Sequence, residues 1–165
     1  MEKEAENSPN DRVIAMTEDR PRAICCHEAG HAVVAWSLKL PVTAIHIINK
    51  ETGWHGGTVA GKADDLRDQV MLLAAGRAAE GVFDCPADER AWLWDFAEIA
   101  SLLLRHGISK RADIDQQIDE ADGRARRVLE AHRDKVLKLT DLLVDGDVDR
   151  TTFERLMNDG MPPAS

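Results

Sequence analysis

Apolar positions in the first third of the chain follow two patterns, one typical of a buried helix and one typical of a short hairpin. Small and apolar residues fill 23–40 almost without interruption, which predicts a largely buried helix that ends before Pro41. β-branched and apolar residues at 42–49 and at 58–60 predict two strands, separated by the turn-rich segment 51–57. We therefore expect a helix followed by a small hairpin.

The middle of the chain predicts two more helices. Asp64-Asp65 is placed to cap a helix at 66–82. After a loop around Pro86, a second helix is expected from about 88 to 106, and Gly107 provides the residue that ends it.

The C-terminal part is predicted to be one long helix and one short helix. Apolar residues recur at intervals of three and four across 114–143, which predicts a single amphipathic helix despite Gly123. A short last helix is expected at 150–157. The whole pattern predicts a mainly α fold with a small β-hairpin.

Size and composition indicate a single domain. The chain has 165 residues, of which 44% are hydrophobic and 31% charged, and this mixture is typical of a globular protein with its own core. Residues 1–17 are charged and mixed and predict a flexible arm, 18–160 form the domain, and 161–165 predict a disordered tail.

Charge and cysteine usage exclude several classes of protein. The net charge of -9 disfavours nucleic-acid binding, which needs a clustered basic surface. The longest apolar runs, such as 32–36 and 102–104, are far shorter than the roughly 20 residues that cross a bilayer. The three cysteines, two of them adjacent at Cys25 and Cys26, have no disulfide spacing and are expected to be buried small hydrophobes. We therefore expect a cytoplasmic protein without a membrane span.

The sequence His27-Glu28-Ala29-Gly30-His31 lies within the first predicted helix. Residues four apart on a helix lie one turn apart on the same face, so both imidazoles can reach one metal ion. Glu28 lies on the adjacent side, where it can accept a proton from a water bound to zinc instead of binding the metal. The motif therefore predicts two zinc ligands and a general base.

Two other interpretations of this motif are less favourable. In the first, a buried helix simply contains two histidines, but two neutral imidazoles in an apolar setting need other hydrogen-bond partners, and a metal satisfies them together. In the second, Cys26 is a further ligand, but it is rotated about 100° from His27 on the helix and is poorly placed.

Three segments of the chain, at 27–36, 76–80 and 131–143, resemble the peptidase domain of the FtsH-type AAA proteases, which are membrane-anchored, ATP-dependent zinc proteases. Residues 27–36 are similar to that family's zinc helix, and 76–80 resemble its next helix. Residues 131–135, followed by Leu142-Leu143, are similar to its C-terminal helix. The resemblance spans about 17–160 and implies a helical zinc-metallopeptidase domain.

The resemblance implies that Asp95 is the third zinc ligand, because it matches the family's aspartate on a later helix. The sequence departs from the family around this position, since Trp94 replaces a polar neighbour and 85–92 lacks the usual glycine and threonine residues. Glu98, one helical turn later, is the competing ligand and otherwise a group that orients a histidine.

The second strand of the hairpin matches the family's edge strand, along which an extended substrate pairs by main-chain hydrogen bonds. The implied substrate-binding residues are Gly57, Thr58, Val59 and Ala60. A plain hairpin that only covers the core is the alternative. The chain contains no tyrosine, which leaves His55 in the predicted turn as one of few candidates to stabilise an oxyanion.

Residues 56–63 match a phosphate-binding loop except at their last position, Ala63, which lacks the hydroxyl that binds magnesium. Part of the segment is itself predicted to be a strand, and no acidic partner on a strand follows. We do not expect nucleotide binding.

These expectations define a zinc-dependent metalloendopeptidase with Zn²⁺ held by His27, His31 and Asp95 and with Glu28 as general base. A polypeptide is the expected substrate. Neither the family's ATPase module nor its membrane anchor is expected from this sequence, so a separate ATPase or a homo-oligomer is the further partner that we consider. The alternatives are a catalytically idle peptide-binding or regulatory module and a protein with a structural zinc.

Overall fold

The computed structural model describes residues 20–86 and 89–159. Six helices and three strands make up this part of the chain, which confirms the mainly α fold with a small sheet; in order they are α1 (Arg22–Ser37), β1 (Val42–Lys50), β2 (Gly53–Ala60), α2 (Leu66–Val82), α3 (Glu89–Arg105), α4 (Arg111–Ala131), α5 (Arg133–Asp145), β3 (Val148–Asp149) and α6 (Arg150–Asn158). The predicted arm at 1–17, the predicted tail at 161–165 and the predicted helix start at 88 lie outside the described residues.

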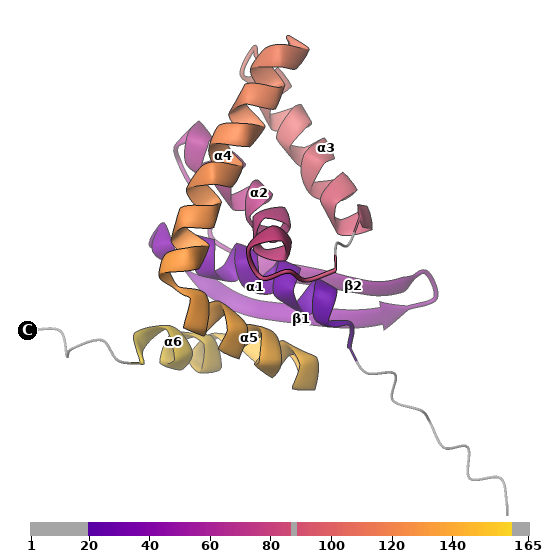
Figure 1. Ribbon diagram of the computed structural model, residues 1–165, viewed down its shortest axis with the longest axis vertical. Coiled ribbons are helices and arrows are strands. Elements are labelled where there is room, and N and C mark those ends of the chain that lie inside the picture. Colours follow the sequence, from indigo (N-terminus) through magenta and orange to yellow (C-terminus); the bar gives the residue numbers. More distant parts are fainter. Residues whose placement is uncertain (1–19, 87–88, 160–165) are drawn as a thin grey trace, which may run out of the picture.

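Helix α1 is the centre of the fold. It contacts α2, α5, β1 and β2, and Figure 1 shows it between α2 and the strands. Because neighbours surround it, nearly every residue from Ile24 to Ala35 is buried, as the apolar sequence predicts. A Cβ added to Gly30 would lie 2.6 Å from the carbonyl oxygen of Ala75 and 2.6 Å from the Cβ of Ala79. Gly30 therefore allows α1 and α2 to pack with their backbones in contact.

The sheet has the strand order β2-β1-β3, and both pairings are antiparallel. Strand β2 is longer than predicted: it begins at Gly53, because the segment expected to be a turn pairs with β1 from Lys50↔Gly53 onward. The turn is formed by Glu51 and Thr52, and Gly53 has a φ of 104°, which favours glycine. Within the described residues, β2 pairs on one side only and is an edge of the sheet.

The single C-terminal helix expected at 114–143 is wrong, because the chain forms two helices that meet at His132. Its φ of -116° and ψ of 26° lie outside the helical region and change the direction of the chain. The imidazole of His132 packs edge-on against the ring of Trp36, with ring centroids 5.2 Å apart. Helix α4 can therefore pack on α2 while α5 packs on α1.

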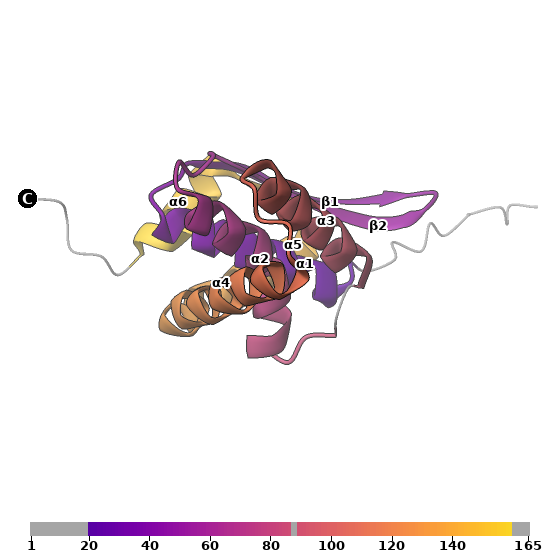
Figure 2. The same ribbon diagram turned by 90° about the horizontal axis from the view of Figure 1, so that it is seen from above.

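Helix α3 lies at the edge of the molecule. It contacts α2 and, less extensively, α4, and its buried apolar residues are Ile99, Leu102 and Leu103. Figure 2 shows α3 on the same side as the turn of the β1–β2 hairpin. None of the helices at 20–86 and 89–159 combines the length and the apolar character that a membrane span needs.

Candidate metal centre

The structure brings together His27 and His31 from α1 and Asp95 from α3. One ligand atom from each residue lies within 4.8 Å of the others. The Nε2 atoms of the two histidines are 3.1 Å apart, and the Oδ2 atom of Asp95 lies 2.9 Å from the first and 3.2 Å from the second. Two imidazole nitrogens and one carboxylate oxygen thus converge on one point, a donor set that suits zinc.

The opposite ring nitrogens are held by other groups. Nδ1 of His27 lies 2.9 Å from Oε1 of Glu80, and Nδ1 of His31 lies 2.8 Å from the carbonyl oxygen of Leu72. A carbonyl oxygen only accepts hydrogen bonds, so Nδ1 of His31 donates, and Nε2 is left to bind a metal. The carboxylate of Glu80 can accept from His27 in the same way.

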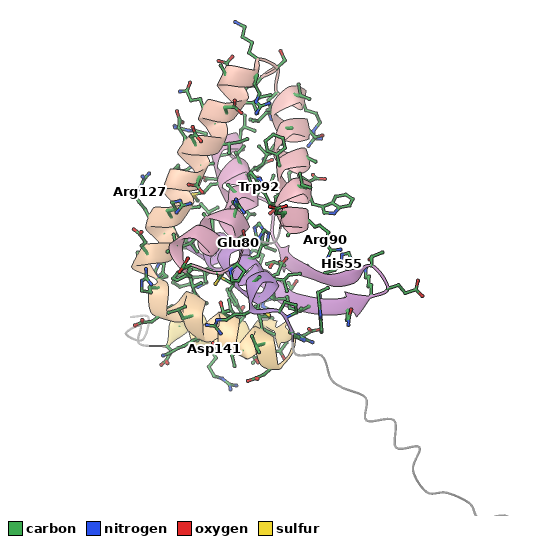
Figure 3. The ribbon with its side chains drawn as sticks, turned by 45° about the vertical axis from the view of Figure 1, so that its right-hand side comes forward. His55, Glu80, Arg90, Trp92, Arg127 and Asp141 are labelled. Atoms are coloured by element: carbon green, nitrogen blue, oxygen red, sulfur yellow. The ribbon has the colours of Figure 1, made fainter. Side chains whose placement is uncertain are left out.

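Glu80 is a functional residue that the sequence reasoning did not assign. It is 3% exposed, and Arg77 donates a hydrogen bond of 3.2 Å to its Oε2 atom. Figure 3 shows Glu80 inside the molecule. The sequence did contain a sign of its importance, because Glu80 ends the segment 76–80 that resembles the second helix of the protease family. Nothing in that segment, however, shows that the Glu80 carboxylate faces the ring of His27.

Glu98 does not join this cluster. Its side chain is exposed and lines a separate cavity with Lys62 and Leu102. The groups that accept hydrogen bonds from the Nδ1 atoms of the two rings are Glu80 and the carbonyl of Leu72 instead.

Strand β2 positions Glu28, which is 6% exposed. The hydroxyl of Thr58 lies 2.7 Å from Oε2 of Glu28 and 3.1 Å from its main-chain oxygen. A Cβ added to Gly56 would lie 2.4 Å from Oε1 of the same carboxylate. The absence of a side chain at Gly56 therefore gives the carboxylate its space, while Thr58 fixes its orientation.

Helix α2 makes room for the first histidine. A Cβ added to Gly76 would lie 2.3 Å from Nε2 of His27, so any larger residue would displace the ring. Gly76 and Glu80 are one turn apart on α2, where the first accommodates the ring and the second contacts its Nδ1 atom.

Opposite charges govern the protonation of the cluster. Burial lowers the pKa of His27, but hydrogen bonds to Asp95 and Glu80 outweigh it and raise that pKa to about 10. Burial also lowers the pKa of His31, but the hydrogen bond to Asp95 and the negative charges of Asp95 and Glu28 together outweigh it, so that this pKa is raised. Burial raises the pKa of Asp95, but hydrogen bonds from the two histidines lower it to about 2. These acidic surroundings favour a positive charge, either as protons on the rings or as a bound metal cation.

Two cavities flank the cluster between β2 and α3. One, of about 160 Å³, is lined by His27, Glu28 and Asp95 together with His55 and Trp94. The other, of about 270 Å³, has Glu28 and Asp95 in its lining and extends to Leu72, Leu73 and part of β2. The two cavities share Glu28, Gly56 and Asp95 in their linings, so they adjoin each other along β2, and together they are called the groove.

Three of the four residues predicted to bind substrate, Gly57, Thr58 and Ala60, line this groove, whereas the fourth, Val59, does not and is 49% exposed. His55 lines the cavity beside Glu28, with its Nε2 atom 2.7 Å from the hydroxyl of Thr52. Residues 56–60 of the phosphate-loop-like segment lie in β2, paired with β1, and do not form a loop.

Comparison with known proteins gives one informative result. No family model matches the chain. The chain is 30% identical to the "ATP-dependent zinc metalloprotease FtsH" of Pseudomonas putida, in a match that covers 72% of this chain and 27% of that protein. The chain therefore spans about a quarter of the length of this relative. The match confirms the resemblance predicted from the sequence: over 72% of its length, the chain is related to the FtsH-type zinc metalloproteases.

Proposed function

We propose that this protein is a zinc-dependent metalloendopeptidase that hydrolyses peptide bonds in unfolded or flexible polypeptides. The observation that carries the proposal is the convergence of His27, His31 and Asp95 beside the oriented carboxylate of Glu28. The groove that runs past these residues gives a polypeptide access to them.

His27, His31 and Asp95 would hold the zinc, and the three-residue set leaves a fourth position open, as in catalytic sites. Zinc bound in such a site polarises a carbonyl and lowers the pKa of a water to about 7. Glu80 and the carbonyl of Leu72 support the site by fixing the orientation of the two rings.

Glu28 is the group that moves the proton. Its carboxylate accepts a proton from the attacking water and then gives it to the amine that leaves when the peptide bond breaks. The hydrogen bond from Thr58 holds the carboxylate in one orientation, so that little rearrangement is needed before proton transfer.

The edge of β2 supports an extended substrate. An extended peptide can pair with a strand edge by main-chain hydrogen bonds, and β2 carries such an edge along the groove. A segment must leave its own fold before it can pair in this way, and domain stabilities of roughly 5 to 15 kcal/mol make spontaneous exposure rare. The expected substrates are therefore unfolded or flexible chains.

A structural zinc and a catalytically idle binding module are the competing functions. A structural zinc is usually enclosed by four protein ligands, whereas the metal-binding group found in the described residues contains three. An idle module has no need for a buried carboxylate oriented beside the cluster, yet Glu28 is 6% exposed and hydrogen-bonded to Thr58.

The test compares zinc-loaded wild-type protein with a Glu28→Gln variant on an unfolded protein and on a tightly folded one. We expect cleavage of the unfolded protein only, with zinc retained and turnover reduced at least about 100-fold in the variant, because an amide does not accept the proton. Equal turnover by the two proteins would remove Glu28 from the mechanism, and zinc-loaded protein that cleaves neither substrate would favour an idle module.

A further inference from the structure

The groove differs in character on the two sides of the candidate metal centre. Toward α2, it is lined by the aliphatic side chains of Leu72 and Leu73. Toward the start of α3, its walls are aromatic, with Trp54 on β2 and Trp94 on α3. Trp54 and Arg90 also line a neighbouring depression of about 540 Å³, so the aromatic side opens into wider space.

Trp94 is unusually exposed for a residue of its size. It is 73% exposed and directly precedes Asp95, and it lines the same cavity as the candidate metal centre. Its neighbour Leu93 is 64% exposed but does not line that cavity. Tryptophan is enriched among residues that dominate binding energies, whereas leucine is under-represented. Of these two adjacent and exposed apolar residues, Trp94 is therefore the one placed to contact a substrate in the groove.

A hydrogen bond links the two elements that carry the aromatic walls. Nη1 of Arg90 on α3 donates a hydrogen bond of 2.6 Å to the carbonyl oxygen of Thr52 in the β1–β2 turn. The guanidinium also covers Gly53, where an added Cβ would lie 2.9 Å from Nη2. Figure 3 shows Arg90 beside the hairpin, close to His55. Arg90 therefore ties the helix that carries Trp94 to the hairpin that carries Trp54.

We propose that the space between Trp54 and Trp94 is a subsite for one aromatic or large apolar side chain of the polypeptide substrate. The inference rests on the proposed function and adds a preference to it: cleavage sites should carry such a side chain at one fixed position on one side of the scissile bond. An aromatic ring can pack against either tryptophan and lie within reach of the Arg90 guanidinium, and both contacts favour it over a small polar side chain.

The experiment measures binding, so that it does not depend on turnover. The full chain with Glu28→Gln is loaded with zinc and titrated into fluorescently labelled ten-residue peptides of serine, alanine and glycine. One phenylalanine is moved through the positions, and the all-small peptide is the reference. We expect the phenylalanine peptides that place the ring in the subsite to bind at least about fivefold tighter than the reference.

Matched variants locate the preference. Trp94→Ser should abolish the phenylalanine preference, while Leu93→Ser, which removes a neighbouring exposed apolar side chain from the same helix, should retain it. Trp94→Leu should keep part of the preference and serves if the serine variant binds less zinc, since Trp94 adjoins Asp95. Zinc content and thermal unfolding are measured for every variant.

The outcomes separate the two proposals. A phenylalanine preference that is the same with and without Trp94, in variants that retain zinc, would overturn the subsite alone. Binding that depends on Trp94, without cleavage of any peptide by the wild-type enzyme, would support the subsite and contradict peptidase activity. If no peptide binds, the subsite is wrong; cleavage of the same peptides by the wild-type enzyme then decides the activity separately.

Discussion

The two sides of the candidate metal centre differ in how firmly the fold holds them. On α1, His27 is almost completely buried, and the Nδ1 atom of each of the two histidines is hydrogen-bonded to a residue of α2. On α3, Asp95 is partly exposed, and its hydrogen bonds are to the two histidines themselves. Contacts with α2 therefore orient the two histidine rings before any metal binds, whereas the orientation of the Asp95 carboxylate depends on its contacts with those rings.

This difference suggests a division of roles. The interior pair of helices orients the two candidate histidine ligands, and the peripheral helix carries the third candidate ligand, Asp95, together with the exposed Trp94. We expect substitutions in α3 to disturb the core less than substitutions in α1, because α3 has fewer packing partners. The following predictions test this comparison, beginning with the largest expected effect.

Removal of the α3 ligand should have the largest effect on metal binding. Asp95→Ala leaves two histidine ligands, and we expect zinc affinity to fall by more than about 100-fold. Glu98→Ala, one turn away on the same helix, should bind zinc like the wild type because its side chain is exposed outside the cluster. Competition with a chelator measures both affinities, and the reverse result would exchange the roles of the two acids.

The pH dependence should have opposite signs in the metal-free and zinc-bound protein. The raised pKa of His27, about 10 against an ordinary 6.5, stabilises the metal-free fold fully below pH 6.5, and this stability is lost as pH rises through 10. The lowered pKa of Asp95 adds stability above about 3.8 that is lost as pH falls toward 2. Zinc must displace the ring protons, so its affinity should rise by about tenfold or more per pH unit between 6 and 8.

Chemical denaturation of metal-free protein from pH 2 to 11, together with zinc titrations from pH 6 to 8, checks these signs. A zinc affinity that does not change with pH would mean that the rings carry no protons for zinc to displace.

Loss of the interior support should weaken zinc binding less than loss of a ligand. Glu80→Gln keeps the size of the side chain but removes the charge opposite Nδ1 of His27, and we expect zinc affinity to fall about 10- to 100-fold. Arg77→Gln is the control, because it contacts Glu80 without touching the ring, and it should have a smaller effect. If Arg77→Gln weakened zinc binding more than Glu80→Gln, the assigned role of Glu80 would be wrong.

The smallest effect expected concerns the contact between α1 and α2. Gly30→Ala forces a methyl group to within 2.6 Å of α2 and should lower the free energy of unfolding by about 1–3 kcal/mol. Gly123→Ala places the same methyl group in open space on α4, where Arg127 is the one neighbour within 4 Å, at 3.8 Å. It should raise stability by up to about 1 kcal/mol. Denaturation of metal-free protein measures both, and equal effects would contradict the close packing at Gly30.

The sequence predicted best where local rules and tertiary packing agree. The zinc-motif helix is predicted because small and apolar residues fill it. The cap on α2 is predicted because aspartate favours the N-cap position, and the structure confirms it, since the Asp65 side chain accepts from the main-chain N–H groups of Arg67 and Asp68. Spacing placed His27 and His31 on one face, and the cluster contains both residues.

The errors arose where distant contacts decide the structure. The glycines of β2 suggested a turn, but close approach to Glu28 explains Gly56. No glycine or proline marks the break at His132, because the apolar spacing continues through it while two different helices receive the two segments. Asp95 was placed through the family resemblance, since its 68-residue separation from His27 leaves no local pattern to read.

The most direct test of the account is the position of zinc itself. Anomalous diffraction at the zinc absorption edge, from crystals grown with stoichiometric zinc, locates the metal without reference to activity. We expect one zinc per chain, with Nε2 of His27 and Nε2 of His31 at about 2.0–2.1 Å and a carboxylate oxygen of Asp95 at about 2.0–2.2 Å. Zinc bound elsewhere, or bound by His27 and His31 with Glu98 in place of Asp95, would contradict the proposed site.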